Sequence, residues 1–212
     1  MKIAILCTDP RHPVNAWLER WADVQRARGH AVALLRDRAL LDQGDLLFLV
    51  SCHQMVGADL RARFQRTLVL HASALPQGRG MSPHVWQVLG GADRITVTLL
   101  DAVDELDRGD IWHQVDFRLQ GTELHDEIHA LLFDAELQLM SWAVDHALTA
   151  RPRPQPPGEG SYYRKRVPDD SRIDPQRPLA EAFDLLRIAD PDRYPVFFEM
   201  RGQRYRLRIE KM

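Results

Sequence analysis

Apolar residues along the first 150 positions fall into short runs, separated by longer stretches in which they recur every three or four residues. Short apolar runs are typical of buried β-strands, and the longer stretches are typical of amphipathic helices. Six strands are predicted, at residues 2–7, 31–35, 46–51, 67–71, 95–100 and 111–119. Strands alternating with helices indicate the α/β fold class: a Rossmann-like, open, mostly parallel sheet flanked by helices.

Three helices are predicted among these strands. Asn15 is placed to cap the first, Gly29 ends it, and its buried stripe would be Trp17, Leu18, Trp21 and Val24. The second begins with Ser82 as cap before Pro83 and closes at Gly90 and Gly91. The third runs from Thr122 to near Ala150, with an inward face of Leu124, Ile128, Leu131, Leu132, Ala135, Leu139 and Trp142.

Residues 151–160 hold four prolines and two glycines and are predicted to be a linker. The chain is thereby divided into an α/β domain (1–150), the linker, and a small C-terminal segment (161–212). That segment is predicted to contain a helix at 179–188 and a hairpin that pairs 196–200 with 204–209.

The composition excludes several classes of protein. A formal charge of −2 indicates no surface for nucleic acid or membrane, and no apolar run is long enough to span a bilayer. Cys7 and Cys52 fall in apolar runs and are interpreted as reduced thiols rather than a disulfide. A cytoplasmic protein is therefore expected.

The most informative chemistry lies between His71 and Asp110. His71 ends a predicted strand, a glycine-rich loop with Gly78 and Gly80 follows, and Asp107 and Asp110 flank a later glycine. Because α/β sheets place ligands at the carboxyl ends of their strands, the imidazole and a carboxylate are expected to face one cleft. A histidine paired with a carboxylate is suited to proton transfer near neutral pH.

Two other patterns are weaker. His125 and His129 are spaced as in a zinc-protease helix, but Asp126 follows the first histidine where that motif needs glutamate, so a solvated helix face is preferred and no metal is expected. The first turn, 8–13, lacks the glycines that a dinucleotide requires. Asp9 and Asn15 could still face a ligand there, although simple turn and cap roles are favoured.

The segment from His71 to Asp110 resembles the folate-dependent formyltransferases, whose pattern is Asn-x-His-x-Ser, Leu-Pro, Arg-Gly, Pro, and then Leu-Asp-x-Gly-Asp. The corresponding residues here are His71, Ser73, Leu75-Pro76, Arg79-Gly80, Pro83 and Leu106 to Asp110. The position of the family's asparagine is occupied by Val69, which has no polar group. Another donor must then stabilise the developing oxyanion, and His71, Ser73, Ser51 and a backbone amide are the candidates.

The resemblance implies 10-formyltetrahydrofolate as co-substrate, with His71, Asp107 and Ser73 as catalytic residues. Residues implied on the folate side are Ser51, Met55, Val56, Leu100, Val103 and Asp104. Residues expected on the acceptor side are Asp9, Asn15, Arg79, Gly80, Tyr162 and Tyr163, although the two tyrosines could instead anchor the linker.

The compact N-terminal half is most similar to formyltransferases that act on nucleotide-linked amino sugars, of the UDP-4-amino-4,6-dideoxy type found in pseudaminic acid biosynthesis. The partner implied is thus a small nucleotide sugar, and a homodimer is compatible with the C-terminal hairpin. The alternatives are another amine acceptor (methionyl-tRNA, an aminoacyl carrier or glycinamide ribonucleotide) and a non-catalytic folate-binding relative. Methionyl-tRNA is disfavoured by the near-neutral charge and the short segment after the linker.

Overall fold

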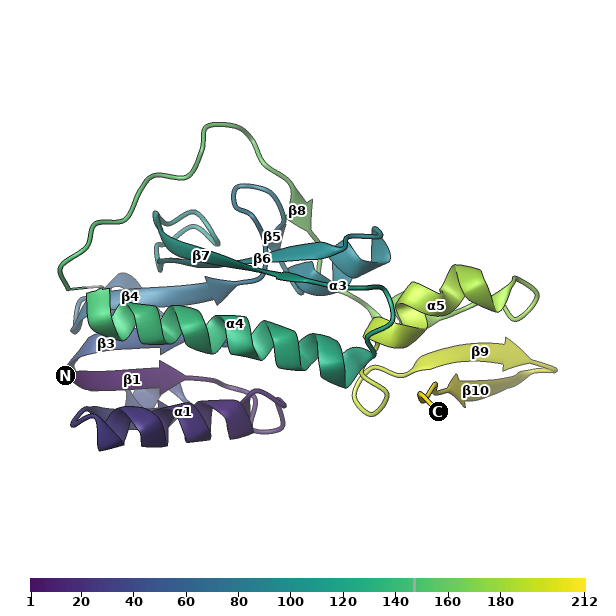
Figure 1. Cartoon of the computed structure of the whole chain (residues 1–212), viewed down its shortest axis with the longest axis horizontal. Coiled ribbons are helices and arrows are strands. Elements are labelled where there is room, and N and C mark those ends of the chain that lie inside the picture. The colour runs from purple at the N-terminus through teal and green to yellow at the C-terminus, as the bar shows by residue number, and fades with distance from the viewer. Residues whose placement is uncertain (147) are drawn as a thin grey trace.

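A computed structural model describes residues 1–146 and 148–212 and contains one six-stranded sheet with the order β2-β1-β3-β4-β6-β7 (Figure 1). The bounds of these strands are β1 (Lys2–Leu6), β2 (Ala31–Leu35), β3 (Gly44–Leu49), β4 (Phe64–His71), β6 (Arg94–Asp101) and β7 (Ile111–Arg118). All six predicted strands are present, and the ends of most differ from the prediction by one to three residues. The predicted α/β fold class with a mostly parallel, helix-flanked sheet is confirmed.

The parallel pattern breaks at β6, which runs antiparallel to both of its neighbours, β4 and β7. Strands β1 to β4 run parallel to their neighbours, whereas β6 runs antiparallel to β4, with His71 opposite Thr98. The helix between them, α3 (Pro83–Leu89), has seven residues and spans only about 10 Å. It is too short to carry the chain back along β4, which parallel pairing would require. The chain reverses at the end of the sheet instead.

Helices α1 (Asn15–Ala27) and α4 (His125–His146) cover one face of the sheet, as Figure 1 shows. The main core cluster on this face takes alternate strand residues, among them Ile3, Ile5, Phe48, Leu68 and Leu70. A second cluster, which includes Leu6, Leu47 and Phe64, forms the opposite face near α2 (Ala58–Arg61). Since Leu70 and Ala72 belong to the α1–α4 face, His71 points to the other face.

Several local helix predictions are wrong. Val24 is 58% exposed rather than part of the buried stripe. Neither Asn15 nor Ser82 caps its helix through a side-chain hydrogen bond: Asn15 is the first helical residue, and Ser82 has a left-handed backbone with φ 50°. The long helix begins at His125 rather than Thr122, because the preceding turn is closed by Glu123, whose carboxylate accepts from the amides of Gln120 and Gly121.

The remaining elements lie after α4. The short strands β5 (Arg79–Gly80) and β8 (Tyr162–Tyr163) pair in parallel, which the sequence did not predict. Helix α5 (Leu179–Ile188) contacts α3 and α4, and β9 (Val196–Met200) pairs with β10 (Gln203–Leu207) as predicted. Two single turns of 3₁₀ helix complete the list, η1 (Arg38–Leu40) and η2 (Pro168–Ser171). Within the described residues, no helix combines the length and apolar character that a bilayer crossing needs.

Candidate active site

His71 and Asp107 meet at the carboxyl end of β4. The imidazole Nδ1 lies 3.5 Å from Asp107 Oδ1, and both residues are 7% exposed. His71 comes from the last position of β4, whereas Asp107 follows the loop after β6. The predicted pairing of this histidine with a carboxylate therefore exists in the fold.

The loop around Asp107 is held in an unusual backbone conformation. Asp107 has a left-handed backbone with φ 55°, and its Oδ2 accepts a hydrogen bond of 2.8 Å from the amide of Gly80. A side chain at Gly109 would place its Cβ 1.9 Å from the carbonyl oxygen of Asp101, so only glycine fits this turn. The Asp-x-Gly sequence thus aims the carboxylate at His71.

The second nitrogen of His71 is also engaged. Its Nε2 lies 2.8 Å from the carbonyl oxygen of Gly78, which can only accept, so Nε2 carries a proton in this arrangement. The other nitrogen, Nδ1, faces Asp107 Oδ1 at 3.5 Å, which is longer than an ordinary hydrogen bond but within the range of an ion pair. The geometry therefore presents His71 as a proton or hydrogen-bond donor that Asp107 supports.

The segment from Gln155 to Tyr163, called the strap here, ties both loops together. Gln155 Nε2 donates to the carbonyl oxygens of Asp107 (2.7 Å) and Gly109 (2.9 Å), and Ser161 Oγ accepts from the amide of Gly78 (2.8 Å). The strap includes the last six residues of the predicted linker. The roles of Gln155 and Ser161 were missed, because no local pattern marks an isolated polar residue as a distant partner.

Val69 lies on the same face of β4 as His71 and contacts an apolar cluster of Leu75, Leu100 and Ile111. Leu100 is only 1% exposed and belongs to this buried apolar cluster on the His71 face of the sheet, so its contact with a pterin stays a prediction. Ser73 is 2% exposed, and no hydrogen-bond partner for its hydroxyl occurs among the described residues.

The predicted folate side consists of two loops joined by Arg61. Its guanidinium donates to the carbonyl oxygen of Val56 (2.7 Å) and to Asp104 Oδ1 (2.6 Å). Met55 (61%) and Val103 (41%) expose apolar side chains on these loops, whereas Val56 is 4% exposed and packs into the core. Val56 therefore offers its backbone rather than its side chain.

The predicted residues of the first turn make structural contacts. Asp9 pairs with Arg193, and the amide of Asn15 donates to the carbonyl oxygen of Asp9 (2.9 Å) while its oxygen accepts from Arg36. Hydrogen bonding by the Arg11 amide lowers the pKa of Asp9. Asn15 is 9% exposed and both polar atoms of its side chain are engaged, so its contact with a substrate stays a prediction. Nearby, Ser51 Oγ lies 3.3 Å from His12 Nε2.

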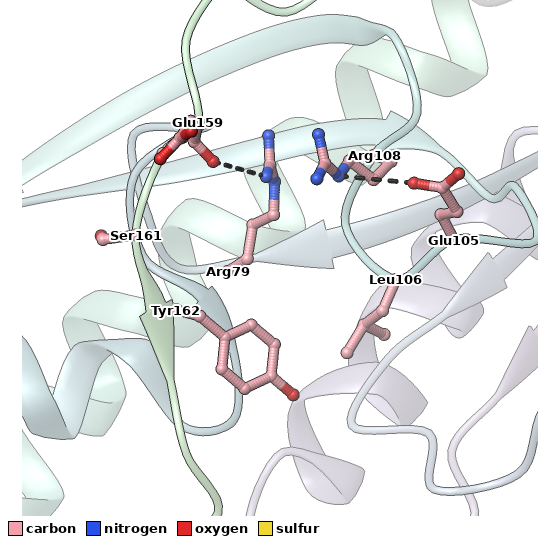
Figure 2. A pocket seen from close by; sticks show the side chains of 8 residues that line it. Arg79, Glu105, Leu106, Arg108, Glu159, Ser161 and Tyr162 are labelled. Atoms are coloured by element: carbon pink, nitrogen blue, oxygen red, sulfur yellow. Dashed lines mark hydrogen bonds and ion pairs between the residues drawn. The ribbon is translucent and has the colours of Figure 1, made fainter.

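The other predicted acceptor-side residues gather beside Asp107. Figure 2 shows a cavity of about 480 Å³ lined by Arg79, Glu105, Leu106, Arg108, Glu159, Gly160, Ser161 and Tyr162. Gly80 packs so closely against the strap that an added Cβ would lie 2.2 Å from the carbonyl oxygen of Tyr163. The ring of Tyr163 stacks on Trp86, with 6.2 Å between centroids, whereas Tyr162 is 64% exposed.

His125 and His129 do not form the solvated helix face that was predicted. Their rings lie 4.0 Å apart, and His129 also contacts His84 and Phe133. Together with His12, these residues form what is called the histidine cluster here: His12, His84, His125 and His129. Burial lowers the pKa of His84 to about 3 and that of His129 to about 2. Within the part of the chain that is described, no group of three or more potential ligands is arranged for a metal.

Comparison with known sequences identifies relatives of this chain. The family model "Formyl transferase" matches residues 8–144, more than half of the chain. Methionyl-tRNA formyltransferase from Bacillus velezensis is 28% identical over 131 residues, which is 61% of this chain and 41% of that protein. The chain thus spans about two fifths of that relative, and 57% of similar enzymes from Bacteroides fragilis.

Solved structures share the fold at low identity. A methionyl-tRNA formyltransferase from Clostridium thermocellum superposes with a TM-score of 0.84 at 19% identity, covering 100% of this chain and 93% of that one. HypX from Aquifex aeolicus in complex with tetrahydrofolic acid superposes with a TM-score of 0.80 at 21% identity, covering 99% of this chain and 37% of that one. A 4-N formyltransferase from Francisella tularensis superposes with a TM-score of 0.74 at 20% identity, covering 100% of this chain and 98% of that one.

The matched region contains His71, the glycine loop and Asp107, the residues that the structure brings together. On the extent of this match, the chain belongs to the formyl transferase family.

Proposed function

We propose that the protein is a folate-dependent N-formyltransferase that acts on the amine of a nucleotide-linked amino sugar, of the UDP-4-amino-4,6-dideoxy type. The observation that carries the proposal is the buried pair of His71 and Asp107, 3.5 Å apart, on the sheet face that carries the buried apolar cluster of Leu75, Leu100 and Ile111. Charged and hydrogen-bonding groups act most strongly on a reacting centre where water is excluded.

The exposed loops beside this pair fit a folate. Met55, Val103 and Leu106 present apolar side chains on loops that Arg61 holds in place, and the carboxylate of Asp104 lies at the edge. An apolar surface with a few polar groups at its edge suits a flat heterocycle. When bound there, 10-formyltetrahydrofolate supplies the formyl group.

The residues of this chain then have separate tasks. His71 donates from Nε2 to the oxygen that gains negative charge as the amine attacks, taking the place of its bond to Gly78. Asp107 supports the imidazole and accepts the proton that the amine loses, directly or through water. That proton would pass to the folate nitrogen, which leaves when its bond to the formyl carbon breaks. His71 thereby supplies the donor that Val69 cannot, and the loop glycines allow the backbone to approach the reacting groups.

The sugar acceptor is supported by a solved structure named as a sugar N-formyltransferase, from Shewanella sp FDAARGOS_354, whose chain is covered to 98%. Methionyl-tRNA is the second candidate, because the curated relatives and one similar structure bear that name. The test is a transfer assay in which 10-formyltetrahydrofolate is offered with a panel of nucleotide 4-amino sugars and, separately, with methionyl-tRNA. Tetrahydrofolate release with one or more sugars is expected.

Release with methionyl-tRNA alone would replace the sugar by the second candidate. If neither acceptor gives release while tetrahydrofolate still binds, the protein is a folate-binding relative without this activity. Tetrahydrofolate that neither binds nor turns over would refute the proposal entirely.

A further inference from the structure

The cavity beside Asp107 contains an arginine that lacks a carboxylate partner. Arg79 is 7% exposed and donates to the carbonyl oxygen of Glu159 (3.0 Å) and the side-chain oxygen of Gln155 (3.3 Å). Its Nε finds no hydrogen-bond partner among the described residues, and none of their ion pairs includes it. Its hydrogen bonds go to neutral oxygens, and the carboxylates of Asp107 and Glu105 act on it only from beyond ion-pair distance, so an anion at this place would stabilise the buried charge.

A second arginine faces the same space. Figure 2 shows the guanidinium groups of Arg79 and Arg108 turned toward one another across the cavity. Burial first, and then the charge of Arg108, lower the pKa of Arg79. Arg108 is paired only loosely with Glu105, at 3.5 Å, and the Glu105 side chain is 78% exposed. This carboxylate can swing into water and leave both guanidiniums to a ligand.

The rest of the lining suits a larger molecule that carries the anion. The exposed ring of Tyr162 and the side chain of Leu106 lie below the two guanidiniums in Figure 2, and the volume of about 480 Å³ exceeds what a bare anion needs. The sequence neighbours of Asp107 form one wall, so a ligand here reaches toward the reacting groups. Glu159 also lines the cavity, and its carbonyl oxygen accepts a hydrogen bond from Arg79.

We infer that this cavity is an oxyanion subsite in which Arg79 and Arg108 bind a phosphoryl or carboxylate group of one of the substrates. The inference rests on the proposed function, because it assigns the anion to a molecule that reacts at His71. Two guanidiniums offer paired donors to the oxygens of one such group. The anion comes either from the phosphoryl groups of the acceptor or from the glutamate carboxylates of the folate.

Calorimetric titration of the whole protein at low ionic strength tests this inference. The probes are inorganic pyrophosphate, UDP, tetrahydrofolate and tetrahydropteroate, which lacks the glutamate. The variants are Arg108→Gln, which removes one charge, and Glu105→Gln, which removes the competing carboxylate. Arg206→Gln, an exposed position on β10, is the matched control. Arg79 stays unchanged because its burial ties it to the fold.

Arg108→Gln should weaken binding of the anionic probe by about 10-fold or more, Glu105→Gln should strengthen it several-fold, and Arg206→Gln should leave it unchanged. An effect on pyrophosphate and UDP assigns the site to the acceptor. An advantage of tetrahydrofolate over tetrahydropteroate that disappears in Arg108→Gln assigns it to the folate.

Equal binding of all four probes by Arg108→Gln and the unaltered protein would overturn the subsite. These titrations need no turnover, so they separate the two claims. Anion binding that depends on Arg108, in a protein that transfers no formyl group to any amine, would refute the proposed function and leave the subsite intact.

Discussion

His71 and the histidine cluster both keep imidazoles away from water, but they differ in what lies opposite each ring. His71 faces Asp107 on one side and the carbonyl of Gly78 on the other. In the cluster, His129 faces other rings, and the carboxylate of Asp190 lies 3.7 Å from Nε2 of His125. The first arrangement holds the imidazole between two fixed acceptors, whereas burial lowers the pKa values of the cluster histidines and favours their neutral form.

The difference has a physical cause in the neighbours. Burial, followed by the charge of Arg193, lowers the pKa of His12 to about 4, and mutual repulsion adds to burial at His129. Neutral rings in such a place pack as aromatic side chains between α4 and α3. A buried histidine therefore indicates chemistry only when a fixed acceptor lies opposite one of its nitrogens.

The sharpest way to break this comparison is to exchange His71 and His84 for glutamine, one at a time. His71→Gln should lower kcat for formyl transfer about 10²- to 10⁴-fold, since a proton donor is lost, with a small change in Tm. His84→Gln should lower Tm and leave kcat almost unchanged, because a polar amide replaces a packed ring. Steady-state kinetics and thermal unfolding of both variants check this. Equal loss of kcat in both would mean that the cluster takes part in the reaction.

Acid titration of stability probes the cluster itself. Its folded-state pKa values lie below the unfolded value of 6.5, so below pH 6.5 the unfolded chain binds more protons and stability falls. Each neutral histidine should contribute a slope of about 1.4 kcal/mol per pH unit. The loss of stability that comes from His12 should end near pH 4, and the loss that comes from His84 and His129 should end at a lower pH.

Replacing one ring should flatten that dependence. His129→Leu removes one proton from the difference in proton binding between the unfolded and the folded chain. The slope of unfolding free energy between pH 6 and pH 4.5 should therefore fall by the contribution of about one histidine. Phe133→Leu, which removes a ring packed on His129 without removing a titratable group, is the control and should keep the original slope. Urea unfolding at several pH values measures both. An unchanged slope in His129→Leu would show that this ring is already charged in the folded protein.

The sequence was sufficient where a feature is local. The six strands, α5 and the hairpin follow from apolar periodicity. The His71–Asp107 pair follows from a residue that ends β4 and a loop that comes after the neighbouring strand β6. Val24 shows the limit: its spacing matches the stripe of α1, but its direction is set by how that helix packs on β2. Periodicity does not fix the rotation of a helix to that accuracy.

Contacts between distant segments could not be predicted from one sequence. The proline-rich composition of residues 151–160 indicates an extended chain, but it does not say what that chain pairs with. Gln155 lies 48 residues from Asp107 in sequence, and its role follows only from the path of the strap across the loops. Likewise, Asn15 has the residue type of a cap and is used instead to join Asp9 and Arg36.

The strap separates the two histidine environments further, because it reaches only the His71 side. Gln155→Ala removes both hydrogen bonds to the carbonyls of Asp107 and Gly109, so the carboxylate should lose its fixed position. We expect kcat to fall about 10-fold, as for the loss of one or two hydrogen bonds. Because Gln155 also accepts from Arg79, KM for the substrate whose anion Arg79 binds should rise as well. Gln176→Ala, at an exposed site before α5, is the matched control.

A glutamate at position 155 makes the same test stricter. Gln155→Glu keeps the size of the side chain but turns two donors into acceptors that face two carbonyl oxygens, which repels the loop. If Gln155 holds Asp107 by donation, Gln155→Glu should be slower than Gln155→Ala, and the pH profile of kcat should shift in both. If Gln155 only fills space, glutamate should retain more activity than alanine. That order of the two variants would mean that β4 and the Asp107 loop position His71 against Asp107 without help from the strap.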